Sequence, residues 1–196
     1  MTALVSRTNT TLADAILKRD GRTLTSDAAL VVLFAGITAL AAQIRIPLPF
    51  TPVPITGQTF AVLLAGAALG ARRGATAMVL YVACGAFGLP FYAGGTGGCA
   101  HIFGPTGGYL LSYPLAAAAV GVLAEHGWDR KVVTTACAML AGSFIIYLCG
   151  VSWLAFYVGG LPHAIVQGCL PFLPGDAIKA VLAALALPGA WKVARR

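Results

Sequence analysis

The chain has 196 residues, of which 59% are hydrophobic and only 10% are charged. One soluble core of this size cannot bury so much apolar surface, so the composition indicates a membrane protein. The net charge of +7 comes from short basic clusters scattered between apolar runs, whereas a nucleic-acid-binding face gathers basic and aromatic residues on one surface. The apolar runs have the roughly 17 to 25 residues that a helix needs to cross a bilayer. We expect an all-α, polytopic integral membrane protein.

Residues 1–26 are polar, and we expect them to form a cytoplasmic tail or a short helix at the membrane interface. Residues 27–196 are expected to form one transmembrane domain, a bundle of six helices. The expected spans cover approximately residues 28–46, 58–71, 74–91, 107–123, 132–158 and 175–191.

Two connections have unusual compositions. The stretch IPLPFTPVPIT, residues 46–56, contains four prolines, which cannot continue a helix. The span after it is short, so we expect this loop to enter the protein below the membrane surface and to line a cavity. The glycine-rich stretch YAGGTGGCAHIFGPTGG, residues 92–108, follows the third span.

The distribution of Lys and Arg predicts the orientation. Eleven of the thirteen basic residues fall on one side of a six-span chain, which the positive-inside rule assigns to the cytoplasm. Both termini then lie inside, and the proline-rich and glycine-rich loops lie outside. The eleven are Arg7, Lys18, Arg19, Arg22, Arg72, Arg73, Arg130, Lys131, Lys192, Arg195 and Arg196.

Asp176 and Lys179 are the acid and the base placed inside an otherwise apolar span, where each charge costs about 2.5 to 3.5 kcal/mol. Their spacing of three residues puts them on one helix face. They can neutralise each other as an ion pair, or offer an acceptor and a donor to a polar ligand. We favour ligand binding, because ionisable residues inside a membrane usually have a function.

Other candidate binding residues lie in the loops that face the same side. Gly95 and Gly97 allow the backbone to approach a ligand closely. The aromatic residues Tyr92, Phe103 and Tyr109 either form the wall of a site for an apolar ring or anchor the chain at the interface.

Three polar residues frame the proline-rich loop. Thr56 and Gln58 end it and enter the second span, where a buried amide needs partners, so we expect them to line the cavity. Arg45 precedes the loop and either extends to lipid headgroups or binds a carboxylate. His101 and His163 have no companion ligand at a recognisable spacing, so we expect no metal site.

A family resemblance extends from about residue 27 to residue 187. It rests on four segments in this order: IPLPFTPVPITGQTFAVLLAG, YVACGAFGLPFYAGGTGG, FGPTGGYLLSYPLAA and FLPGDAIKAVLA. With this set the chain resembles the BioY family, the biotin-specific substrate-binding (S) components of energy-coupling-factor (ECF) transporters. The resemblance implies six transmembrane helices, cytoplasmic termini, an outward-facing biotin pocket under two loops, and a multi-pass location in a bacterial inner (plasma) membrane.

The same resemblance implies roles for individual residues. Asp176 and Lys179 match the polar contacts of the family's PGDxxK motif, and our hypothesis is that Asp176 accepts from a ureido N–H of biotin while Lys179 donates to the ligand. The spacing of Ala35 and Ala39 alone permits close helix packing inside the chain. By the resemblance they match the AxxxA pattern with which S components contact a transmembrane coupling subunit. The other implied partners are cytoplasmic ATP-binding subunits. Biotin is then the transported substrate, and neither a cofactor nor catalysis on this chain is expected.

Two alternatives remain open on the sequence. The chain can be an S component for another small vitamin, because the scaffold and an apolar pocket would look similar. It can also be a membrane-embedded enzyme that uses Asp176 with His163 or His101, although no spacing places those groups within reach of one another. The chain lacks the GxxxxGK[ST] motif of a P-loop ATPase, so energy for transport has to come from other chains.

Overall fold

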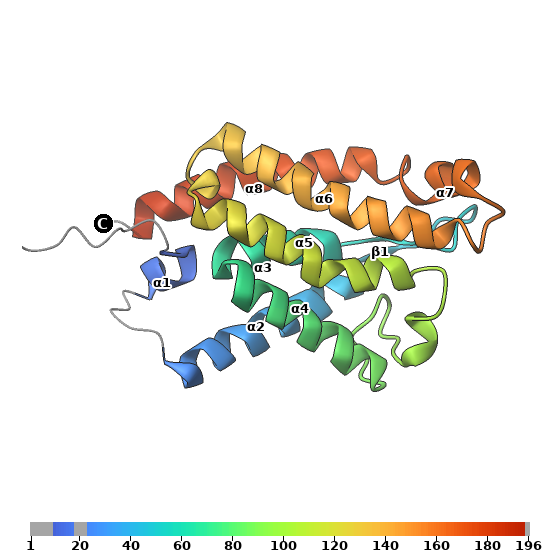
Figure 1. Cartoon of the computed structure of the whole chain (residues 1–196), viewed down its shortest axis with the longest axis horizontal. Coiled ribbons are helices and arrows are strands. Elements are labelled where there is room, and N and C mark those ends of the chain that lie inside the picture. The colour runs from blue at the N-terminus through green and yellow to red at the C-terminus, as the bar shows by residue number, and fades with distance from the viewer. Residues whose placement is uncertain (1–9, 18–22, 195–196) are drawn as a thin grey trace, which may run out of the picture.

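The computed structural model describes residues 10–17 and 23–194, which fold mostly into helices (Figure 1). Four of the described helices are long and apolar enough to cross a membrane: α2 (Leu24–Gln43), α5 (Gly107–Glu125), α6 (Val132–Leu154) and α8 (Leu173–Ala194). The remaining helices are α1 (Leu12–Ile16), α3 (Gln58–Leu69), α4 (Ala71–Ala86) and α7 (Leu161–Gly168), with 3-10 turns η2 (Cys99–His101) and η3 (Trp128–Arg130). Strands β1 (Arg45–Ile46) and β2 (Ile55–Thr56) form one short antiparallel pair.

Helix α5 lies at the centre of the bundle and packs against α3, α4 and α6. Its most apolar window is 61% buried, compared with 17% to 28% in the other three long helices. Glycines allow the close approach: a Cβ on Gly66 of α3 would collide with the backbone of Ala117, and one on Gly121 of α5 with the backbone of Ala71. Small residues therefore set the spacing of α3, α4 and α5.

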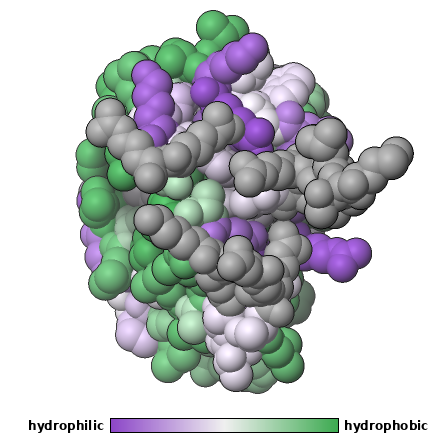
Figure 2. All heavy atoms as spheres, turned by 90° about the vertical axis from the view of Figure 1, so that its left-hand side faces the viewer, coloured by the Kyte–Doolittle hydropathy of each residue, from purple (hydrophilic) through white to green (hydrophobic). Residues whose placement is uncertain are grey.

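The outer faces of the long helices carry large apolar side chains that the protein leaves exposed, among them Leu40, Phe144 and Leu185. Figure 2 looks onto the end that carries α1 and shows hydrophilic residues on that end, with hydrophobic residues along the margin of the molecule. Contiguous apolar faces of this kind suit lipid. The described fold is that of a helical membrane protein.

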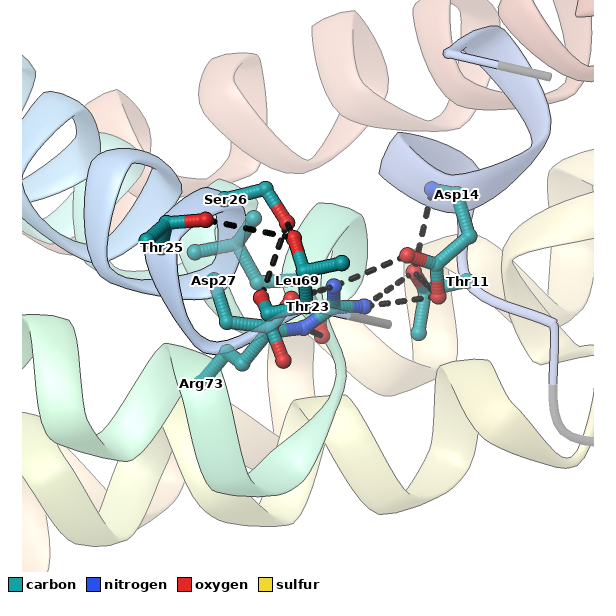
Figure 3. Close-up of polar contacts among 8 residues, drawn as sticks. All are labelled: Thr11, Asp14, Thr23, Thr25, Ser26, Asp27, Leu69 and Arg73. Atoms are coloured by element: carbon teal, nitrogen blue, oxygen red, sulfur yellow. Dashed lines mark hydrogen bonds and ion pairs between the residues drawn. The ribbon is translucent and has the colours of Figure 1, made fainter. Parts of the chain in front are cut away.

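Helix α1 is fastened to the bundle by a buried arginine (Figure 3). The Arg73 guanidinium donates to both carboxylate oxygens of Asp14, each at 2.8 Å, and to the Thr11 hydroxyl at 2.7 Å. It also donates to the Asp27 carboxylate and the Leu69 carbonyl, each at 3.0 Å. This arginine thus joins α1, α2 and α3 to its own helix α4.

Several element boundaries differ from the sequence prediction. The third span was expected to reach residue 91, but α4 ends at Ala86, because Gly88 has a φ of 98° and Pro90 follows. The proline-rich loop contains the β1–β2 pair, which an all-α prediction did not include, and α7 begins with Pro162 in its first turn where only a connection was expected. Of the predicted N-terminal tail, residues 1–9 and 18–22 lie outside the described residues.

The predicted partner contact of Ala35 and Ala39 stays a prediction, and within the described residues both side chains pack inside the chain. Their side chains are only 2% and 8% exposed and belong to the core that α2 forms with α3 and α4. An AxxxA pattern favours close helix approach whichever helix the partner belongs to. Here the neighbouring helices come from the same chain.

Candidate binding site

A cavity of about 250 Å³ lies at the end of the bundle where β1 and α7 are found, opposite α1 (Figure 1). Small-molecule sites typically enclose about 300 to 1,000 Å³, so this cavity suits a small solute. Its wall combines apolar and aromatic side chains from the hairpin, the loop after α4, and helices α5, α6 and α8. Seven of the predicted site residues line it: Arg45, Thr56, Gln58, Tyr92, Tyr109, Asp176 and Lys179.

Two loops border the cavity, as the sequence predicted. In the proline-rich loop, Pro52, Val53 and Pro54 line the cavity, and the β1–β2 pair closes the base of this loop by pairing Arg45 with Thr56. Proline supplies no N–H to the short ladder, so it stands in the turn between the strands. The prolines therefore make this part of the cavity wall rigid and apolar.

The glycine-rich loop contributes Tyr92, Ala93 and Thr96 to the cavity wall, but neither Gly95 nor Gly97 lines it. Gly95 has a φ of 72° and allows the turn that bridges Tyr92 with Thr96. A Cβ on Gly97 would collide with backbone at Leu89. Both glycines therefore shape the turn, and their predicted ligand contact stays a prediction.

Asp176 lies in the first turn of α8, where the positive end of the helix dipole favours a carboxylate. It is 8% exposed and belongs to the cavity wall. Lys179 Nζ donates to its Oδ1 at 2.9 Å, and the Tyr147 hydroxyl of α6 donates to its Oδ2. The ion pair that the spacing predicted is present, and it faces the cavity.

The ammonium group of Lys179 has three N–H donors, and the protein provides an acceptor for each. Besides Asp176, the acceptors are the Thr59 hydroxyl at 2.8 Å and the Thr56 carbonyl at 3.2 Å. Lys179 consequently ties α8 to the start of α3. To donate to a ligand, as predicted, it has to exchange one of these bonds.

A buried polar chain lies beside the ion pair. The Gln58 amide nitrogen donates to the Tyr81 hydroxyl, which donates to the Phe91 carbonyl at 3.1 Å. The amide oxygen of Gln58 accepts from the Thr56 hydroxyl at 3.0 Å and from the Tyr113 hydroxyl at 3.4 Å. Both ends of the amide have partners, which fixes the orientation of its side chain.

Arg45 is exposed and lines the cavity, and among the described residues no carboxylate pairs with it. Its side chain lies over Gly94, where a Cβ would be 2.8 Å from a guanidinium nitrogen. Because Asp176 and Lys179 compensate each other, Arg45 supplies the excess charge of the cavity. A ligand with an anionic group is therefore favoured.

The remaining predicted residues are divided between the cavity and the surface. Tyr92 is buried, donates to the Val82 carbonyl at 2.7 Å and contacts the ring of His101, which also lines the cavity. Burial raises the pKa of the Tyr92 phenol to about 12, so it stays neutral. Phe103 is 70% exposed, and neither it nor His163 belongs to the cavity wall.

Sequence reasoning missed two polar tyrosines in the cavity wall, Tyr113 of α5 and Tyr147 of α6. Both lie inside apolar spans, where a hydroxyl needs a partner, and that requirement was the available signal. It was weak because tyrosine also serves as an interface anchor.

Apolar outer faces and a cavity with a buried carboxylate at one end define a membrane protein that holds a small solute. The family follows from comparison with known proteins: the BioY family model matches residues 8–196, and the chain belongs to this family.

Individual relatives agree with this assignment. The chain is 43% identical to the "Biotin transporter BioY" of Rhizobium etli, with 82% of this chain and 90% of the relative covered. It is 40% identical to the "Probable biotin transporter BioY" of Pyrococcus horikoshii, with 81% and 92% covered. A crystal structure of the S-component for biotin from an ECF-type ABC transporter matches with a TM-score of 0.74 and 26% identity, over 88% of this chain and 95% of that one.

Proposed function

We propose that this chain is the biotin-binding membrane subunit of a biotin uptake transporter. The observation that carries the proposal is the buried, ion-paired Asp176 in the wall of a cavity of about 250 Å³, in a chain of the BioY family. The chain captures and translocates its solute, and it performs no bond chemistry itself.

Biotin has the chemical groups that this cavity can hold. Its ureido group carries two N–H donors and one carbonyl, its fused rings are apolar, and its tail ends in a carboxylate. In our proposal a ureido N–H donates to Asp176, and the ring system lies among the aromatic and proline side chains that include Tyr92 and Tyr109. The tail carboxylate lies near Arg45, whose charge is uncompensated among the described residues.

The other polar residues support this arrangement. Thr56 and Gln58 provide a polar wall beside the ureido group, and Lys179 pairs with Asp176 and offsets its charge. Gly95 and Gly97 act through the turn that presents Tyr92.

We further propose that α2, α3, α4, α5, α6 and α8 all cross the membrane, with both termini in the cytoplasm and the cavity facing outward. The apolar α3, with 12 residues, is short for a crossing, and the hairpin before it covers the missing depth. The protein resides in a bacterial plasma membrane and delivers biotin inward with a transmembrane coupling subunit and cytoplasmic ATPases. Such partners are supported by the likeness to an S-component of an ECF-type ABC transporter, since a component of this kind belongs to a larger assembly.

Equilibrium binding to the purified full chain in detergent tests the function. We expect labelled biotin to bind tightly and to be displaced by unlabelled biotin, but not by thiamine or riboflavin. Displacement by one of those vitamins, with no tight biotin binding, would assign the chain to a different solute. Uptake of labelled biotin by cells that produce the chain, with and without a coupling module, then tests the requirement for partners.

A further inference from the structure

Tyr147 joins a second helix to the carboxylate that the ligand is proposed to contact. It lies on α6, lines the cavity, and donates its hydroxyl proton to Oδ2 of Asp176 on α8. The two residues are 29 positions apart in the sequence, so the contact depends on the packing of α6 against α8.

A count of donors limits what Tyr147 can do. A phenol has one O–H, and this one is already donated to Asp176. Tyr147 therefore cannot donate to a ligand without releasing the carboxylate. Lys179 is restricted in the same way, because its three donors meet Asp176, Thr56 and Thr59.

The acceptor capacity of Asp176 is only partly used. Each carboxylate oxygen has two lone pairs, and one on each oxygen is occupied, Oδ1 by Lys179 and Oδ2 by Tyr147. The two donors approach from different helices, so together they fix the rotation of the carboxylate about its side chain. One acceptor position remains on each oxygen, and a buried carboxylate paired with an ammonium group accepts N–H bonds strongly.

We propose that Tyr147 is a positioning residue: it holds Asp176 as a fixed acceptor for an N–H group of the ligand and acts on the ligand through that carboxylate. This inference rests on the proposed binding role of Asp176. It predicts that the site selects ligands with an amide or ureido N–H at this position.

A double-mutant cycle tests the proposal with Tyr147→Phe, Asp176→Asn and the combination of both. Hydrogen bonds to charged groups contribute enough for Tyr147→Phe to weaken biotin binding about tenfold or more. In the Asp176→Asn background the same substitution should change biotin affinity less than about twofold, because the carboxylate that Tyr147 positions has already been replaced by an amide. The matched control is Tyr157→Phe, which removes a hydroxyl that donates to the Phe103 carbonyl outside the cavity wall, and it should bind as the wild type does.

A second measurement covers the case in which Asp176→Asn binds too weakly for the cycle. Infrared difference spectra of the ligand-free protein should show a shift of a carboxylate stretch in Tyr147→Phe, absent in Tyr157→Phe and absent when Asp176 is already Asn. Equal losses of affinity in both backgrounds, or no carboxylate shift, would overturn the positioning role. If the proposed function is wrong, the wild type will not bind biotin, which distinguishes this failure from failure of the positioning role. The cycle is then measured with the vitamin that the wild type does bind.

Discussion

Substitution of Arg73 by Met is expected to destabilise the protein severely. Arg73 is 8% exposed, and its five N–H donors all have acceptors, at 2.7 to 3.0 Å, on Thr11, Asp14, Asp27 and Leu69. The variant removes the guanidinium that donates to both oxygens of the buried Asp14 carboxylate. Breaking a buried ion pair on one side costs about 3 to 5 kcal/mol.

The neighbouring Arg72 provides a matched control, because it is exposed and lies one residue earlier on the same turn of α4. Arg72→Met should change the free energy of unfolding by less than about 0.5 kcal/mol. Denaturant titration of both variants in detergent measures the difference. The reasoning is refuted if the two variants have equal stability.

The double variant Arg73→Met with Asp14→Asn separates the buried charge from the lost hydrogen bonds. It also replaces the charged carboxylate that pairs with Arg73 by a neutral amide, so it should be more stable than Arg73→Met alone. Because α1 lies at the opposite end of the bundle from the cavity (Figure 1), biotin affinity of the folded fraction should stay close to that of the wild type.

Three further predictions concern the cavity and the packing of the bundle. Asp176→Ala should weaken biotin binding at least about tenfold in an equilibrium assay, since a hydrogen bond to a charged group is lost. Arg45→Gln should weaken biotin several-fold but leave biotinamide, which lacks the carboxylate, unaffected; equal losses for both ligands would exclude the carboxylate contact. Gly66→Ala should lower the melting temperature, because its Cβ meets the backbone of Ala117, whereas Gly36→Ala, which faces open space, should not.

The ion pair in the cavity wall could be predicted from the sequence for an energetic reason. Asp176 and Lys179 stand in an apolar span, and a bilayer tolerates such charges only when something compensates them. Tyr147 carries no comparable penalty, since a tyrosine is acceptable at an interface or in a core. Its role depends on the contact between α6 and α8, which no local pattern encodes.

Small residues were harder to interpret. The AxxxA pattern at Ala35 and Ala39 predicts close helix approach but not the identity of the neighbour, and the structure places both inside the chain's own core. Gly95 was expected at the ligand, yet a positive φ explains it equally well. Arg73 was counted as a topology signal, although its partner Asp14 lies 59 residues away in the sequence. For the alanines and Arg73 the ambiguity arises because the partner is distant in sequence, whereas for Gly95 two local explanations fit the same residue.

A structure of the full chain with bound biotin tests the central claim most directly. The account predicts biotin in the cavity of about 250 Å³, with a ureido nitrogen within hydrogen-bond distance of an Asp176 oxygen and the tail directed toward Arg45. Biotin bound elsewhere, or bound in this cavity with its ureido group away from Asp176, would contradict it.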